Sequence, residues 1–303
     1  DINLGVDDAV EADFCFSNCR IYGNRITNCF VGLSSQPGLG GPNYFFRNSM
    51  YNLTHGAFKL KRFSQGDVVM HNTVVKAGAG LGGNDSMDYA WFRNNLAIGG
   101  PDGGVKWGDY GAGRPSAADI IKPKAHCSFD YDTVGVEGIP YVALIGNRPF
   151  SSVDVHGLEG VTLDNLFNGV SFPFPPVPEK PVPDLRLKAG AKVIDAGMII
   201  PNINDHFNGA APDIGAYEYG SSLSPAYLLY VRTTGTPDNS CSTWSDACDL
   251  QTALAFFAPE YEIWVAEGTH TPTTGTERTA TFQLKTGVAI YGGFPDVGNP
   301  TWA

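Results

Sequence analysis

Basic side chains recur at one position of a short repeated pattern, the residue that immediately precedes an asparagine. They are Arg47, His71 and Arg93, which follow one another at intervals of about two dozen residues. If successive repeats stack about 4.8 Å apart, as adjacent strands do, these side chains form a basic column. Arginine binds carboxylate and sulfate groups through paired hydrogen bonds. With Lys61 on the next apolar patch, the column predicts a binding surface for an acidic polysaccharide.

Proton abstraction is the reaction that this arrangement could perform. Lys59 is the candidate base, and Arg47 would neutralise the carboxylate beside the proton that is removed. This is the chemistry of a polysaccharide lyase. Hydrolysis would instead need two carboxylates about 5–10 Å apart, for which Asp67, Asp85 and Asp88 are candidates. A solvated outer face and a glycan-binding face without catalysis are the competing interpretations.

Oxygen ligands for calcium cluster in two loops, one with Asn84, Asp85 and Asp88 and the other rich in asparagine. Asn202, Asn204 and Asp205 offer amide and carboxylate oxygens, which Ca²⁺ prefers. Their spacing matches no regular calcium-binding repeat, and local turn chemistry explains the same residues. We therefore expect that no cofactor is required and keep Ca²⁺ as the one candidate ion.

The six cysteines fall into two groups and one isolated residue. Cys241 and Cys248 lie close together in a loop rich in Ser, Thr and Asp, and we expect them to form a disulfide, with two buried thiols as the alternative. Cys15, Cys19 and Cys29 have no histidine nearby, so a metal site is disfavoured. Free core thiols or a single disulfide are expected there.

The composition limits the classes of partner. The net charge is -11 and the pI about 4.9, which disfavours a duplex nucleic acid, because neutralising phosphates requires a basic footprint. No apolar run approaches the roughly 20 residues of a membrane-spanning helix, so direct membrane insertion is not expected. Only 17% of residues are charged, while the chain has 37 Gly and 21 Pro, which favours short strands and tight turns.

The basic residues must be positioned by a repeat of about 24 residues. Its pattern is two apolar residues, a variable one, Asn, a polar residue and an apolar one, with spacings of 24, 24 and 22 residues between the asparagines. One such coil cannot bury its inward face, whereas stacked coils bury a continuous core. The asparagines would form a ladder at a corner of the stack, unless they are merely enriched in the turns of an antiparallel sandwich. The predicted ladder is Asn24, Asn48, Asn72 and Asn94.

These repeats resemble the right-handed parallel β-helix family of pectate lyases. The segment 212–219, Pro-Asp-Ile-Gly-Ala-Tyr-Glu-Tyr, resembles the closing strand of bacterial surface proteins in that family. The resemblance implies an all-β solenoid over residues 1–219 with coils of about 22–24 residues, and a secreted or cell-surface location. We expect a long excursion at 99–155 and a stiff Pro-rich connector at 172–183.

A second module is predicted after a linker at 220–226. Residues 227–303 contain an expected strand at 228–231, an amphipathic helix at 249–257, and strands at 262–269 and 288–294. This order resembles the N-terminal capping region of another β-helix, of the type found in polymorphic outer-membrane proteins. We interpret it as the beginning of a second solenoid, which further residues or a partner would complete.

Two functions follow from these patterns. The first is a cell-surface module with a structural, adhesive, filament-forming or glycan-binding role, whose partners are a polysaccharide or neighbouring copies or modules of the same protein. The alternative is a lyase that acts on a uronate-containing polysaccharide. The fold alone does not decide between them, because one solenoid can host either.

Overall fold

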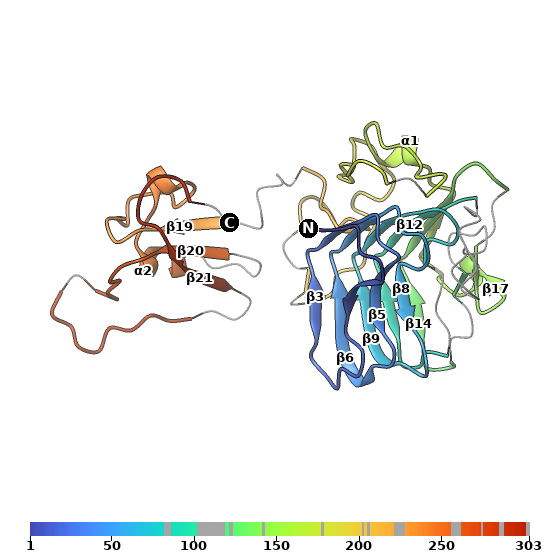
Figure 1. Ribbon diagram of the computed structural model, residues 1–303, viewed down its shortest axis with the longest axis horizontal. Helices are drawn as coiled ribbons and strands as arrows, with labels where there is room; N and C mark the ends of the chain where they lie inside the picture. Colours follow the sequence, from blue (N-terminus) through green and yellow to red (C-terminus); the bar gives the residue numbers. More distant parts are fainter. Residues whose placement is uncertain are drawn as a thin grey trace. The chain divides into compact units, whose positions relative to one another are not determined.

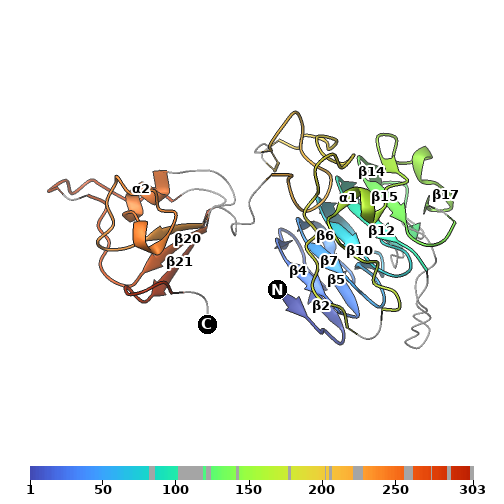
Figure 2. The same cartoon turned by 90° about the horizontal axis from the view of Figure 1, so that it is seen from above.

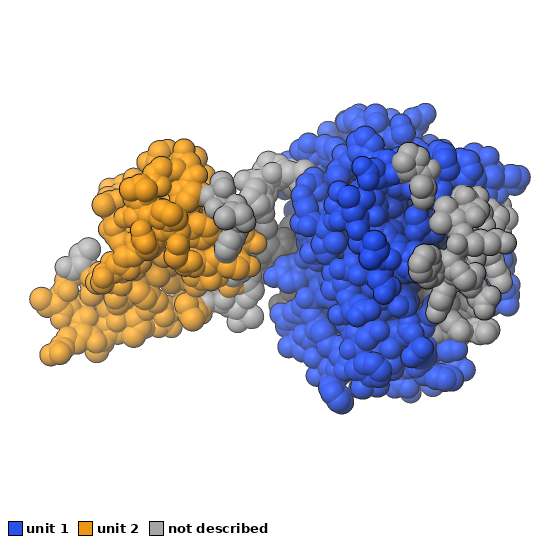
Figure 3. All heavy atoms as spheres, in the orientation of Figure 1, with its two compact units in different colours: residues 1–221 blue, residues 222–303 orange. Residues whose placement is uncertain are grey.

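The computed structural model describes most of the chain and divides it into two compact units, Asp1–Ser221 and Ser222–Ala303 (Figure 3). This division falls within the predicted linker, and each unit is considered by itself below. The described residues are 1–81, 86–101, 119–120, 124–140, 143–176, 179–201, 203–204, 207–220, 228–255, 262–273, 275–284 and 288–300.

The first unit is a parallel β-solenoid, and the whole chain has about 10 turns of this kind. Successive coils contribute strands to three sheets of different lengths, and the sheets form three faces around a common core (Figure 1). The five-stranded sheet contains β3 (Arg20–Tyr22), β6 (Leu39–Phe46), β9 (Gln65–Met70), β11 (Trp91–Arg93) and β14 (Ser128–Asp130). The seven-stranded sheet contains β1 (Ile2–Asn3), β4 (Arg25–Thr27), β7 (Ser49–Tyr51), β10 (Thr73–Val75), β12 (Leu96–Gly99), β15 (Thr133–Val136) and β18 (Leu158–Glu159). The three-stranded sheet contains β2 (Asp8–Glu11), β5 (Val31–Ser35) and β8 (Phe58–Leu60).

In the five- and seven-stranded sheets, the core consists mainly of the central residue of each apolar triplet, whereas in β8 it consists of Phe58 and Leu60, on either side of Lys59. Side chains alternate between the two faces of a strand, so a three-residue strand with an apolar centre directs that centre inward. The strands are in parallel register, which places the inward residues of successive coils directly above one another. Buried members of these columns include Phe45, Val69, Phe92, Phe129, Ile26, Met50, Val74, Ala97 and Val134.

An asparagine ladder runs along the corner between the five- and seven-stranded sheets, as the repeat predicts. The Nδ2 of Asn24 donates to Oδ1 of Asn48 at 3.0 Å, and the Nδ2 of Asn48 donates to Oδ1 of Asn72 at 3.0 Å. The next member is Asn95, at 2.9 Å, so the prediction of Asn94 was wrong by one residue. The ladder then ends on Oδ1 of Asp132, which accepts from the Nδ2 of Asn95 at 2.8 Å.

The one-residue error has a packing cause. Phe92 is the apolar centre of β11 and pairs with Val69, the centre of β9. This register aligns Asn94 with His71 and Asn95 with Asn72. Burial of Phe92 in the core determines the strand register more strongly than the residues that follow it. The position before the ladder is a left-handed turn in every coil, occupied by Gly23, Arg47, His71, Asn94 and Tyr131, with φ between 51° and 67°.

The predicted excursion at 99–155 is too long. The coil resumes at β14 and β15, which pair in parallel with β11 and β12 and return the chain to two of the sheets. A small separate sheet and a 3-10 turn lie around this point, and a short helix follows them. These elements are β13 (Asp119–Ile120), β16 (Leu144–Ile145), β17 (Arg148–Pro149), the 3-10 turn Phe150–Ser152 and α1 (Leu163–Leu166).

The outer face of the seven-stranded sheet is buried under residues 161–219, which we call the covering segment (Figure 2). A second apolar core forms between them, in which Val75, Leu96 and Ile98 of the sheet meet Leu166 and Val193 of the covering segment. The covering segment contains the Pro-rich connector, and the described part of that connector crosses the solenoid surface.

Polar contacts fix the connector to a second corner of the solenoid. The Nδ2 of Asn52 donates to the carbonyl of Pro176 at 3.0 Å, and the Nδ2 of Asn28 donates to that of Lys180 at 2.9 Å. Both asparagines have positive φ, 57° and 56°, a conformation that Asn tolerates better than most residues. The same two residues therefore turn the chain and hold the connector.

The motif at 212–219 is not a strand, contrary to the prediction. Gly215 has a φ of 117°, and a β-carbon there would lie 2.7 Å from Oγ1 of Thr73, so this position requires glycine. The amide of Gly215 donates to the carbonyl of Asn94 at 2.8 Å, and that of Ala216 donates to Oγ1 of Thr73 at 2.8 Å. The motif closes the unit by docking onto the outside of the sheet.

The second unit has a three-stranded parallel sheet with one short helix against it. The predicted helix begins at Leu250, and its described part ends at Ala255. Within the described ranges, none of the helices is long and apolar enough to span a membrane. The elements are β19 (Leu228–Val231), β20 (Glu262–Ala266), β21 (Ala289–Phe294), a 3-10 turn at Trp244–Asp246 and α2 (Leu250–Ala255). That this unit begins a second solenoid stays a prediction.

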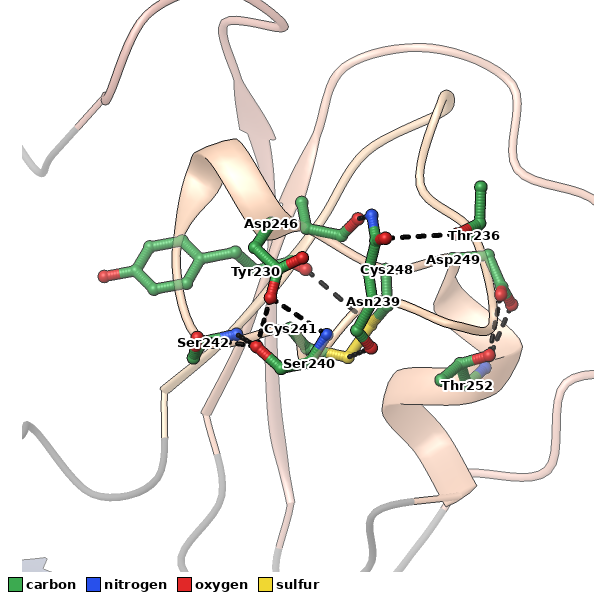
Figure 4. The surroundings of a disulfide bond; sticks show 11 residues. Tyr230, Thr236, Asn239, Ser240, Cys241, Ser242, Asp246, Cys248, Asp249 and Thr252 are labelled. Atoms are coloured by element: carbon green, nitrogen blue, oxygen red, sulfur yellow. Dashed lines mark hydrogen bonds between the residues drawn. A yellow bond between two sulfur atoms is a disulfide. The ribbon is translucent and has the colours of Figure 1, made fainter.

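Cys241 and Cys248 form the expected disulfide, within the loop that connects β19 to α2 (Figure 4). The loop is closed further by the Nδ2 of Asn239, which donates to the carbonyl of Ala247, and by a hydrogen bond between Ser240 and Asp246. Covalent closure of a loop stabilises a small unit chiefly by restricting its unfolded chain.

Candidate functional site

Aromatic side chains gather on the outer face of the five-stranded sheet, whose strands β3, β6 and β9 lie side by side in Figure 1. Because the central residue of each strand points inward, its two neighbours point outward. The outward side chains form two columns along the solenoid axis, with one row per coil, and the row of β9 holds Val68 and Met70 in place of aromatic rings. We call the surface made by Arg20, Tyr22, Tyr44, Phe46, Trp91 and Arg93 the aromatic face.

Stacking within the aromatic face presents flat ring surfaces. The rings of Tyr22 and Phe46 are 4.8 Å apart and inclined by only 9°, and Tyr22 is 53% exposed. The guanidinium carbon of Arg93 lies 4.5 Å from the centre of the Trp91 ring, a cation–π arrangement that orients the indole. The half-buried rings are thus held in place while one surface remains accessible.

A ridge of exposed aromatic residues borders the aromatic face at the corner that it shares with the three-stranded sheet. Phe14, Phe16, Phe63 and Tyr89 are each more than half exposed. All but Phe16 have positive φ, a conformation that bulky residues rarely adopt and that strains the backbone. Exposed apolar patches of this kind mark binding surfaces in soluble proteins.

Cys15 and Cys19 form a disulfide that closes the short loop containing Phe16. This pairing is one of the two outcomes that the sequence left open for these cysteines. Cys29 is a free, buried thiol, and burial raises its pKa. The disulfide therefore fixes one end of the aromatic ridge and adds a second covalent link to the chain.

Two exposed histidines lie beside the aromatic face. Each packs against an aspartate and a tyrosine of the preceding coil. In His126 the Nδ1 atom is 3.1 Å from Oδ1 of Asp88, and the ring stacks on Tyr89 with centroids 4.4 Å apart. An aspartate that accepts from Nδ1 leaves Nε2 directed elsewhere, which is the arrangement of a general base or a ligand-binding group.

The second histidine repeats this geometry at the other edge of the sheet. The Nδ1 of His156 is 2.9 Å from Oδ2 of Asp130, and its ring stacks on Tyr131 at 4.7 Å. Partial burial raises the pKa of Asp130, but hydrogen bonds from His156 outweigh it and hold that pKa below its ordinary value. Asp130 also pairs in register with Arg93, so this part of the sheet contains a candidate base, a carboxylate and a cation.

The predicted basic column does not form. His71 is buried and aligns with Asn94 rather than Arg93, because of the register of β11. Arg93 instead lies one residue earlier, on the aromatic face, where it donates to Oγ of Ser128 at 2.8 Å. Arg47 remains in the corner turn one coil from His71, so the structure brings together only two of the three predicted residues.

Lys59 is not placed to act as a base. Its Nζ lies 2.6 Å from Oδ2 of Asp8, whose side chain is fully buried. Burial lowers the pKa of Lys59, but the hydrogen bond and the charge of Asp8 raise it more, so the amine stays protonated at neutral pH. Lys59 lies in the three-stranded sheet, whereas Arg47 lies at the corner between the other two sheets. Lys61 follows β8 in the next turn and is half-buried.

The other predicted ligands and carboxylates are not gathered into a site. Asn202, Asp205 and Asp85 lie outside the described residues. The buried amide of Asn204 is engaged by protein groups, since its Nδ2 donates to His71 and its Oδ1 accepts from the amide of Ile200. Asp67 is buried. The described part of the chain contains no group of three or more His, Cys, Asp or Glu residues that could hold a metal ion.

A buried carboxyl pair at the end of the asparagine ladder was missed by the sequence analysis. The backbone amide of Asp132 lies 3.3 Å from Oδ2 of Asp154, and both side chains are buried. Burial and the charge of Asp132 raise the pKa of Asp154, so the pair retains a proton at neutral pH. Because neither carboxyl reaches the surface, the pair ends the ladder and cannot serve as a hydrolytic pair.

Strand alternation is the signal that could have revealed the aromatic face. The triplets at 20–22, 44–46 and 91–93 read Arg-Ile-Tyr, Tyr-Phe-Phe and Trp-Phe-Arg, with large side chains on both sides of the inward residue. A buried strand in a solenoid requires only its centre to be apolar. The aromatic rings on either side of the inward residue are therefore not required to form the core.

Comparison with known proteins adds no assignment. No protein-family model matches the chain. No curated protein matches it either.

Proposed function

We propose that this chain is an extracellular or cell-surface solenoid module that binds a polysaccharide along its aromatic face. The observation that carries the proposal is the set of partly exposed aromatic rings on the outer face of a parallel sheet, where Tyr22 stacks on Phe46 and Arg93 lies over Trp91. Sugars present apolar ring faces that pack on aromatic side chains, and their hydroxyl groups meet polar neighbours such as Arg20 and Ser128. Strands spaced about 4.8 Å apart would let the glycan run along the solenoid axis and meet one row of side chains per coil.

The other two faces suit a glycan less well. The outer face of the seven-stranded sheet is covered by residues 161–219. The three-stranded sheet carries Glu11 with Asp13 close by, which would repel an anionic chain, and its Lys59 is paired with the buried side chain of Asp8. Of the three sheet surfaces, the aromatic face is the one that remains, and it includes the exposed cation of Arg20.

Two disulfides support a location outside the reducing cytoplasm, where such bonds persist. The resemblance of the repeats to pectate-lyase-type β-helices of bacterial surface proteins is consistent with this location. An acidic solenoid held by disulfides is also suited to a structural or adhesive role, with the glycan as its attachment point.

Truncating the aromatic face is expected to weaken glycan binding. Trp91→Ala and Tyr44→Ala should each reduce affinity roughly 5- to 30-fold, the factor that corresponds to about 1–2 kcal/mol per truncated aromatic anchor. A glycan array on the full chain would select the ligand, and isothermal titration calorimetry would measure the variants. Phe174→Ala is the matched control, because Phe174 is 48% exposed on the covering segment.

Loss of affinity in the control as well as in both face variants would argue against the aromatic face. Failure of every glycan class on the array, with self-association of the chain instead, would favour a filament role that buries the same rings against a second copy.

A lyase remains the second candidate, on the basis of His156, Asp130 and Arg93. His156 would take the proton beside the uronate carboxylate, Asp130 would orient its imidazole, and the cation would stabilise the developing charge. The test is the ultraviolet absorbance of unsaturated products after incubation with pectate, alginate or glycosaminoglycans, with His156→Ala as the variant. The absence of such products in the wild-type chain would leave binding as the function.

A further inference from the structure

A cavity of about 330 Å³ lies in the second unit, between three segments of its surface. Its walls come from the loop after β19, from the beginning of α2 and from the loop after β20. This volume is at the lower end of the range for small-molecule sites, which is about 300–1,000 Å³. A molecule the size of one or two sugar rings would occupy it.

Uncommitted hydrogen-bonding groups line this cavity. Among the described residues, the hydroxyls of Thr269 and Thr271 and the side-chain amide of Gln251 have no partner. Each of these groups can both donate and accept. Pro237 and Pro272 add apolar surface to the walls. The lining therefore matches a ligand that has several hydroxyl groups and one apolar face.

The charged groups at the cavity are already engaged by other protein groups. The guanidinium of Arg232 lies 2.8 Å from Oδ1 of Asp296 and donates to the carbonyl oxygens of Trp244 and Gly298. The carboxylate of Asp249 accepts from both the amide and the hydroxyl of Thr252, as Figure 4 shows. Within the described residues no basic side chain is paired with Asp249, so its negative charge disfavours phosphorylated or acidic molecules.

Covalent and steric constraints hold the walls in place. The loop after β19 passes so close to the disulfide loop that a β-carbon on Gly235 would lie 2.0 Å from the carbonyl of Cys248. The disulfide Cys241–Cys248 fixes the other side of this contact (Figure 4). A preformed site of this kind loses little entropy when a ligand binds.

We infer that the second unit contains a binding site for a small uncharged sugar, separate from the aromatic face and independent of its function. The hydroxyls of Thr269 and Thr271 and the amide of Gln251 recognise the sugar hydroxyls, while the prolines pack on its apolar face.

Saturation-transfer NMR and calorimetry on the full chain test this site, with maltose, cellobiose and lactose as probes. Combined Thr271→Val and Gln251→Leu substitutions should weaken binding of the best probe about tenfold or more, because buried ligand hydroxyls lose their partners. The control Thr234→Val, in the same loop but outside the lining, should bind like the wild type. Trp91→Ala should also leave this affinity unchanged, which separates the site from the aromatic face.

Three results would overturn the inference. They are the absence of saturable binding for all three sugars, wild-type affinity in the Thr271→Val, Gln251→Leu variant, and tighter binding of a glucose phosphate than of glucose. Near-ultraviolet circular dichroism of the variants checks that the surface substitutions leave the fold intact.

Discussion

Asn72→Ala is expected to lower the free energy of unfolding of the solenoid by about 3–5 kcal/mol, which would make it one of the most damaging single substitutions in the chain. Oδ1 of Asn72 accepts from both the backbone amide and the Nδ2 of Asn48, at 3.1 and 3.0 Å. Its Nδ2 donates to the carbonyl of Phe45 and to Oδ1 of Asn95, both at 2.9 Å. Alanine leaves these groups buried without partners, and each unpaired group costs about 1–3 kcal/mol.

Urea denaturation followed by circular dichroism measures this loss. Asn24→Ala is the matched control, because Asn24 is the outermost member of the ladder and only half-buried, so water can replace its contacts. A difference between the two variants of less than about 1 kcal/mol would mean that the ladder contributes little beyond ordinary turn geometry.

Acid is expected to weaken the docking of the covering segment through His71. Nε2 of His71 accepts from the Nδ2 atoms of Asn94 and Asn204, at 3.0 and 2.7 Å, and its Nδ1 lies 3.3 Å from the carbonyl of Gly215. This arrangement requires the neutral ring with its proton on Nδ1. Burial and the charge of Arg47 lower the pKa of His71 to about 3, although hydrogen bonds to backbone groups at 213 and 215 oppose the shift.

The direction of the pH effect follows from this lowered pKa. An unfolded histidine titrates near pH 6.5, so the stabilising contribution is complete above that value and declines as pH falls toward 3. Between about pH 7 and about pH 4.5 the wild type should lose about 2–3 kcal/mol more than His71→Gln, whose amide cannot be protonated in this range. Parallel pH dependence in the two proteins would contradict this role of His71.

Proteolysis of the covering segment provides an independent readout of the same event. Cleavage within residues 179–201 should become faster in the wild type than in His71→Gln when the pH is lowered, because opening exposes this backbone. Equal cleavage rates at low pH would show that the segment opens without protonation of His71.

The solenoid could be predicted from the sequence because its signals are periodic and local. Asn24, Asn48 and Asn72 recur at a constant spacing next to apolar strand centres, and the structure places them in one ladder. The error at Asn94 arose because two adjacent asparagines fit the pattern equally well. Only the alignment of Phe92 with Val69 in the core distinguishes them.

The candidate site could be predicted only in part, because it depends on contacts between distant coils. Lys59 is a residue type that can act as a catalytic base. Its ion-pair partner Asp8, however, is 51 residues away in the sequence and does not lie in the adjacent coil. His156 and Asp130 come together because the chain between them returns to the solenoid earlier than the repeat indicates. Burial and ion pairing determine whether a charged side chain can act as a base or bind a ligand. Neither can be predicted from the spacing of residues within one coil.

The aromatic face is the central claim of this account, and a structure of the full chain with the glycan selected on the array tests it most directly. The account predicts that the sugar rings lie over Tyr22, Tyr44 and Trp91, with the glycan following the solenoid axis from coil to coil. A glycan bound across the acidic three-stranded sheet, or beneath the covering segment with these rings left bare, would contradict it.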